Sequence, residues 1–135
     1  MAKTLKFTSY GKDYKVSMNR TSYSSNKSLA IMCIVVGCTD EDSFPGEPYG
    51  FITTNVPGVG GNIVALDDNN APDACAEFMK HIVTETEEDG TNLDIHGNVI
   101  EEVWGRWYGM TRSGYCEYHL VKLTDEFINS LDSYK

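Results

Sequence analysis

The sequence predicts an α+β fold: a mainly antiparallel sheet of five to six strands, with one amphipathic helix packed on it and a short C-terminal helix. Three observations lead to this prediction. Alternating or continuous apolar stretches recur between turn residues, as in strands. One internal segment, residues 75–82, has apolar residues at helical spacing. Thr124 is followed by acidic residues, which is typical of a helix start. The length of 135 residues fits a single compact domain, residues 1–135.

The N-terminal half is expected to form strands. Residues 5–18 alternate apolar and polar side chains around a turn, which predicts a hairpin. After the polar, serine-rich connection at 19–27, residues 29–36 are continuously apolar and rich in β-branched side chains. This pattern favours a central strand covered on both faces. An acidic, proline-containing loop at 39–48 then precedes a further strand at 49–56.

The C-terminal half combines the two helices with further strands. A helix is predicted to begin near residue 71, because capping residues, an early proline and Asp73 occur there. Its apolar stripe is expected to pack on the sheet and consists of Cys75, Phe78, Met79 and Ile82. Residues 115–123 predict a last long strand, and the segment from Thr124 to Leu131 predicts the terminal helix.

Charge and composition exclude several classes of protein. The chain has 20 acidic and 11 basic side chains, a net charge of −9, and a sequence pI near 4.6. This charge repels phosphates and anionic lipids at long range, so it disfavours nucleic acids and membranes as direct partners. Because no apolar run reaches ~18 residues and residues 1–7 lack a secretory core, we expect a cytoplasmic protein without a membrane segment. Its four cysteines are expected to be reduced.

No motif assigns a reaction or a cofactor. Cys116 and His119 would point to opposite faces of a strand, which argues against a catalytic dyad. The glycines at 57–61 lack the Lys-Ser/Thr of a phosphate-binding loop. One alternative stays open: a small hydrolase or transferase in which clustered carboxylates hold a divalent metal, although no cluster has the ordered spacing of an EF-hand.

Three groups of residues are candidates for binding a partner protein, and one is the acidic cluster Asp40, Glu41 and Asp42 in the loop at 39–48. Acidic residues in the run 84–90 oppose the dipole of the helix expected before them, so helix stability does not account for them. The stretch 104–112 combines two tryptophans with arginine, and since one buried face cannot hold both tryptophans, one is expected at a rim. The candidate partner-binding residues are Trp104, Arg106, Trp107, Tyr108, Glu85, Glu87, Glu88, Asp89, Asp40, Glu41 and Asp42.

Three segments carry a family resemblance. They are the hairpin around Tyr10-Gly11-Lys12-Asp13-Tyr14, Leu29-Ala30-Ile31 before the apolar strand, and Gly46-Glu47-Pro48-Tyr49-Gly50 leading into residues 51–57. In these segments the chain resembles an uncharacterised family of small proteins, a domain of unknown function, found in bacterial mobile elements and phages. The resemblance implies an accessory protein of a mobile element in the host cytoplasm, and it implies no reaction.

These observations together predict a non-enzymatic acidic binding protein that engages a host protein with a basic surface, such as a defence factor. Spaced carboxylates can imitate phosphates on a basic groove while aromatic side chains anchor the contact, so inhibition by nucleic-acid mimicry is the expected mode. The sequence is also compatible with a homodimer. The alternative function is that of a hydrolase or transferase that depends on a divalent metal.

Overall fold

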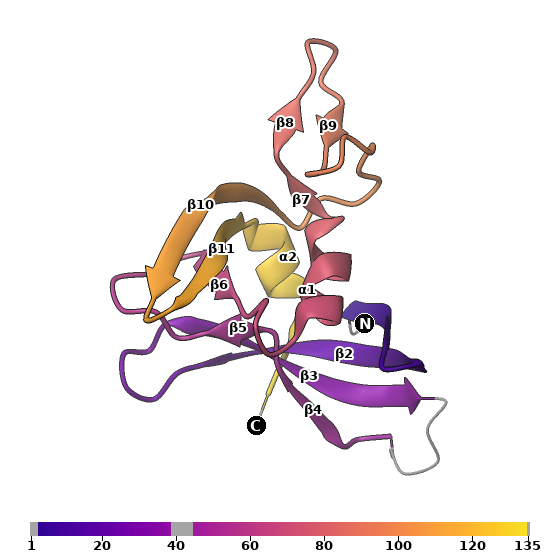
Figure 1. Cartoon of the computed structure of the whole chain (residues 1–135), viewed down its shortest axis with the longest axis vertical. Coiled ribbons are helices and arrows are strands. Elements are labelled where there is room, and N and C mark those ends of the chain that lie inside the picture. Colours follow the sequence, from indigo (N-terminus) through magenta and orange to yellow (C-terminus); the bar gives the residue numbers. More distant parts are fainter. Residues whose placement is uncertain (1–2, 39–44, 135) are drawn as a thin grey trace.

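Two five-stranded sheets and a projecting two-stranded hairpin make up the computed structural model, which describes residues 3–38 and 45–134 (Figure 1). The elements in chain order are β1 (Lys3–Ser9), β2 (Lys12–Ser22), β3 (Leu29–Cys38), β4 (Pro48–Phe51), β5 (Thr53–Thr54), β6 (Ile63–Leu66), α1 (Pro72–Met79), β7 (Ile82–Val83), β8 (Glu85–Thr86), β9 (Asn92–Leu93), β10 (Gly105–Ser113), β11 (Cys116–Leu123), α2 (Asp125–Ser130) and β12 (Asp132–Ser133). Neither helix in this part of the chain is long and apolar enough to cross a membrane.

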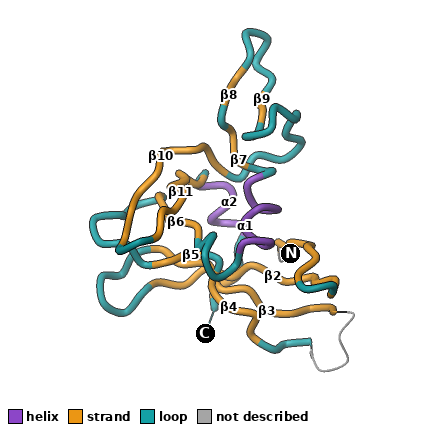
Figure 2. The backbone as a smooth tube through the Cα atoms, in the orientation of Figure 1, coloured by secondary structure: helices purple, strands orange, loops and turns teal. Residues whose placement is uncertain are grey.

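The predicted α+β class is wrong, because the fold is mostly β. Of the described residues, 51% are in strands and 11% in helices. The apolar stretches do not join one sheet of five to six strands, since they are divided between two sheets and a separate hairpin (Figure 2). The expected amphipathic helix is also shorter than its apolar stripe: α1 ends at Met79, and Ile82 belongs to β7.

The first sheet has the strand order β1-β2-β3-β4, with β12 pairing in parallel to β2. The N-terminal hairpin is confirmed, with antiparallel pairing from Lys3↔Met18 to Ser9↔Lys12. The central strand is confirmed as well, since β3 lies between β2 and β4. Alternation places Leu5 and Phe7 of β1 towards the core and Lys6 outside, as expected for a sheet with one covered face.

The second sheet has the order β5-β6-β11-β10-β7, in which β10 and β11 form the long antiparallel pair. The chain enters this sheet at Ile52, directly between β4 and β5. There the Ile52 N–H donates to the Ile31 carbonyl at 3.2 Å, and the Ile31 N–H donates to Thr53 Oγ1 at 3.1 Å. These bonds tie the two sheets together where the chain passes between them.

Both sheets and both helices contribute to one main core. Met18 and Ile31 of the first sheet, Val121 of the second, Phe78 of α1 and Phe127 of α2 belong to it. Truncating a core aromatic such as Phe78 to alanine costs about 3–5 kcal/mol. The helices therefore hold the sheets together, and from this body the β8–β9 hairpin projects at the top of Figure 1.

Candidate functional site

The acidic run forms the tip of a projecting hairpin, which we call the acidic hairpin (residues 84–100). Glu85 pairs with Leu93 and Thr86 with Asn92 across β8 and β9. The Glu87 N–H donates to the Thr91 carbonyl at 2.8 Å and closes the turn. The expectation that these carboxylates follow a helix end is wrong, because α1 ends before β7 and a helix dipole acts only within its last turn.

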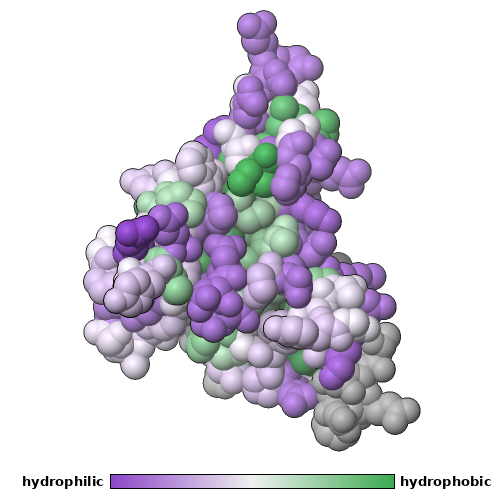
Figure 3. Space-filling view, in the orientation of Figure 1, coloured by the Kyte–Doolittle hydropathy of each residue, from purple (hydrophilic) through white to green (hydrophobic). Residues whose placement is uncertain are grey.

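The carboxylates of the tip lie in water without cationic partners. Glu85, Glu87, Glu88 and Asp89 are all exposed. Within residues 3–38 and 45–134, none of the four forms an ion pair. The Thr91 hydroxyl and backbone N–H lower the pKa of Asp89, so this carboxyl is held in its charged form. Figure 3 shows the tip of the projection covered with hydrophilic residues.

A second, buried carboxylate organises the base of the acidic hairpin. Asp94 Oδ1 accepts the His96 N–H at 2.8 Å and the Asn98 N–H at 3.0 Å. Burial acts to raise the pKa of Asp94, but the backbone donors of Asn98 and His96 overcome it and leave the pKa below its usual value. The turn leaves the apolar side chains of Ile95 and Val99 exposed at the base of the hairpin.

Strand β10, which begins near this hairpin, carries two exposed aromatic side chains. Trp107 is 41% exposed and Tyr108 is 60% exposed. The register with β11 shifts between Trp107 and Gly109, so Tyr108 is the extra residue of a β-bulge. Arg106 is exposed too, and its Nη2 donates to Thr86 Oγ1 at 2.9 Å. This bond links the start of β10 to β8 and places the acidic and aromatic candidates in one region.

Trp104 does not belong to this surface. It is only 3% exposed and stacks on His81, with ring centroids 3.6 Å apart, and on Phe127, at 4.9 Å. Its Nε1 has no hydrogen-bond partner in the described part of the chain. Trp104 is therefore a core residue, whereas Trp107 is the tryptophan at the rim, as the sequence predicted of one of the two. Asp40, Glu41 and Asp42 lie outside the described residues.

The side chains considered for catalysis stay apart. Cys116 packs on a small cluster around Tyr118, whereas His119 Nδ1 lies 3.0 Å from Asp68 Oδ2. The Asp68–His119 pair joins residues 51 positions apart, and no local motif pointed to it. Among the described residues, no three His, Cys, Asp or Glu side chains come together in an arrangement that could hold a metal ion.

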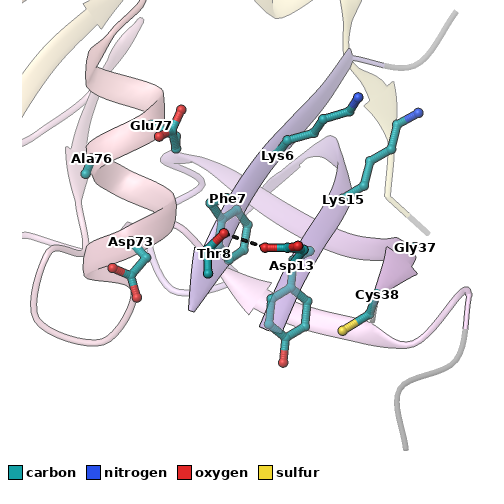
Figure 4. Close-up of a pocket in the computed structure, with 11 residues that line it drawn as sticks. Lys6, Phe7, Thr8, Asp13, Lys15, Gly37, Cys38, Asp73, Ala76 and Glu77 are labelled. Atoms are coloured by element: carbon teal, nitrogen blue, oxygen red, sulfur yellow. Dashed lines mark hydrogen bonds between the residues drawn. The ribbon is translucent and has the colours of Figure 1, made fainter. Parts of the chain in front are cut away.

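A cavity of about 800 Å³ beside α1 was also missed by sequence reasoning (Figure 4). Lys6 and Lys15 are cross-strand partners on β1 and β2 and line one side of the cavity, and neither forms an ion pair within the described chain. Asp73 and Glu77 of α1 line the other side, and Glu77 is bound by Lys80 at 2.8 Å. The cavity forms because α1 packs beside β1, so no local pattern in the sequence predicts it.

Comparison of the chain with protein-family models, with curated proteins and with solved structures found no match.

Proposed function

We propose that this chain is a non-enzymatic binding protein that engages a partner with a basic surface through the acidic hairpin, Trp107 and Tyr108. The observation that carries the proposal is that the four carboxylates at the hairpin tip are exposed and, within the described residues, form no ion pair. Two exposed aromatic side chains lie on β10, which begins near the hairpin. Arg106 connects the two groups through its hydrogen bond to Thr86.

The two groups would serve a partner in different ways. Like charges on one hairpin repel one another, so they do not stabilise the fold. Towards a basic surface the same charges accelerate association and make it depend on salt. Aromatic side chains that become buried supply most of the binding energy in protein interfaces. The carboxylates thus steer the partner, and Trp107 and Tyr108 anchor it.

We further propose that the protein is an accessory of a phage or mobile element that acts in the host cytoplasm on a protein with a nucleic-acid-binding groove, such as a defence factor. The resemblance carried by the N-terminal hairpin and by residues 46–57 supports the origin. The net charge of −9 supports mimicry, because carboxylates on a projection can occupy phosphate positions in a basic groove. The same charge disfavours nucleic acid as the direct partner.

The test is capture of proteins from a bacterial host lysate at two salt concentrations, about 0.05 M and about 0.3 M. At the higher concentration the Debye length is below ~10 Å, so charges on the two proteins are screened from each other. We expect the captured protein to bind DNA, to be displaced by a DNA duplex and to be lost at the higher salt. Changing Glu85, Glu87 and Glu88 to glutamine should abolish capture, and Trp107→Ala should weaken it without lowering the melting temperature.

A matched control neutralises three other exposed carboxylates, Asp73, Glu126 and Asp132, and so changes the net charge equally. Capture should survive this change. If the control and the hairpin variant lose capture alike, net charge rather than the hairpin is responsible. If neither variant nor salt alters capture, the acidic hairpin is not the contact surface.

A further inference from the structure

A second cavity, of about 480 Å³, lies between the tip of the β1–β2 hairpin, β4 and the loop before α1. Three tyrosines line it: Tyr10 and Tyr14 come from the hairpin, and Tyr49 comes from β4. Phe51 of β4 also lines the cavity, but its ring packs on Tyr23, with centroids 5.7 Å apart. The loop contributes Asp67. Tyrosine rings and a carboxylate are the components with which proteins recognise organic cations, because the ring faces carry partial negative charge.

The inner rings of this cavity are held in place by the core. Tyr14 and Tyr49 meet edge to face, with centroids 5.3 Å apart and planes at 67°. Phe7, which is buried, stacks on Tyr14 at 5.4 Å and meets Tyr49 edge to face at 5.1 Å. These contacts fix both tyrosine rings before any ligand arrives, which lowers the entropic cost of binding.

Asp67 places a buried carboxylate in the lining without a cationic partner. The residue is only 8% exposed. Its oxygens accept the backbone N–H of Asn70 at 3.1 Å and the Asn70 Nδ2 at 3.0 Å. Both donors are neutral, and in the described part of the chain no Lys, Arg or His forms an ion pair with Asp67. Buried carboxylates are normally paired with a cation, so this site lacks its counter-charge.

Tyr10 at the mouth of the cavity is unfavourable for the fold by itself. It has a φ of +51°, and Gly11 after it has a φ of +76°, so both residues of the turn are left-handed. Asn, Asp and Gly are the usual residues in such turns, and a bulky side chain there is strained. Tyr10 is also 97% exposed and buries nothing within the chain. A ligand in the cavity that contacts its ring accounts for a tyrosine at this position.

We infer that this cavity binds an alkylammonium group, with Asp67 as its counter-charge, Tyr14 and Tyr49 beside it and Tyr10 over its mouth. The ammonium can belong to a free small molecule, or it can be a methylated lysine side chain of a partner protein. The inference does not rest on the function proposed for the acidic hairpin, because none of these residues belongs to that surface.

Choline is the first probe, with its uncharged isostere 3,3-dimethyl-1-butanol as the comparison, and binding is followed in the NMR spectra of the full chain. We expect saturable shifts of the Tyr14 and Tyr49 ring signals with choline and none with the alcohol at equal concentration. Equal shifts with both compounds would mean a merely apolar cavity and would overturn the inference.

Peptides separate the two sources of the cation. One peptide carries trimethyllysine and its twin carries glutamine at the same position. Tighter binding of the trimethyllysine peptide than of choline assigns the cavity to a partner's side chain, whereas choline binding as tight or tighter assigns it to a small molecule. If neither choline nor the trimethyllysine peptide shifts the ring signals, the cavity is not an ammonium site.

Two variants and a control test the residues. Tyr10→Asn keeps a residue suited to the left-handed turn, so it should fold normally and bind choline about threefold more weakly. Asp67→Asn should weaken choline binding by about tenfold or more, because it removes the counter-charge. Tyr115→Asn, at a fully exposed tyrosine in the other long hairpin, should change nothing. If Asp67→Asn fails to fold, Tyr10→Asn decides, and unchanged choline affinity in that variant overturns the inference.

Discussion

Asp94 makes the base of the acidic hairpin rigid, and replacing it with alanine is the sharpest test of that role. The change removes the acceptor of two backbone N–H groups, those of His96 and Asn98. A hydrogen bond to a charged group contributes about 1.5–3 kcal/mol. Because the freed N–H groups lie near the surface and water can reach them, we expect the loss of both bonds together to fall within that range. The turn should then open about 10- to 100-fold more often.

Amide hydrogen exchange measures this opening residue by residue. We expect faster exchange at His96 and Asn98 in Asp94→Ala, whereas the amides of the β2–β3 pair should keep the wild-type rate because they lie in the other part of the fold. Asp94→Asn is the matched control, since it keeps one oxygen acceptor and should show a smaller effect. Unchanged exchange at His96 and Asn98 in the alanine variant would refute the assigned role.

The same carboxyl makes the hairpin sensitive to acid. Its pKa is lower in the folded protein than in the unfolded chain, so its contribution to stability is fully present above the unfolded pKa of about 3.9. The contribution is lost as the pH falls below that value and through the lowered folded pKa. Exchange at His96 and Asn98 in the wild type should therefore approach that of Asp94→Ala in acid, after correction for the intrinsic rate.

Other changes have equally definite outcomes. Gly105→Ala should lower the free energy of unfolding by about 2–3 kcal/mol in denaturant titration, because the new Cβ would lie 2.6 Å from the Lys122 carbonyl oxygen. Burial raises the pKa of the Cys33 thiol to about 12, so mass spectrometry after alkylation at pH 8 should find native Cys33 unmodified and the half-buried Cys38 and Cys116 modified. Thr124→Ala should cost about 0.5–2 kcal/mol, because Thr124 Oγ1 accepts the N–H of the third helical residue of α2; an unchanged denaturation midpoint would contradict this.

Sequence reasoning succeeded where the signal is local. The β1–β2 hairpin follows from alternation around a turn, and the start of α2 follows from Thr124 and the acids after it. The separation of the tryptophans into one buried and one exposed also followed from their spacing. Sequence reasoning failed for the acidic run. The apolar stripe that ends at Ile82 predicted a helix up to that residue, but Ile82 belongs to the short strand β7. A single apolar residue at that position is compatible with a helix and with a short strand.

For the candidate sites too, the sequence predicts the types of side chain but not which of them come together. The sequence shows the acidic character of residues 85–89 and predicts that one tryptophan is exposed. That β10 begins near the acidic hairpin depends on the tertiary structure, which includes the bond from Arg106 to Thr86. The cavity around Asp67 has no counterpart in any local pattern, since its tyrosines come from two hairpin positions and from β4.

The amino-acid order alone determined the turns, most strands, the charge and the types of side chain available, because each depends on neighbours within a few positions. Only tertiary structure decided that the chain changes sheets at Ile52, that β7 pairs with β10, and that Asp67 lies among aromatic rings. These contacts join residues far apart in the chain, and their energies depend on packing and burial that no local stretch of sequence contains.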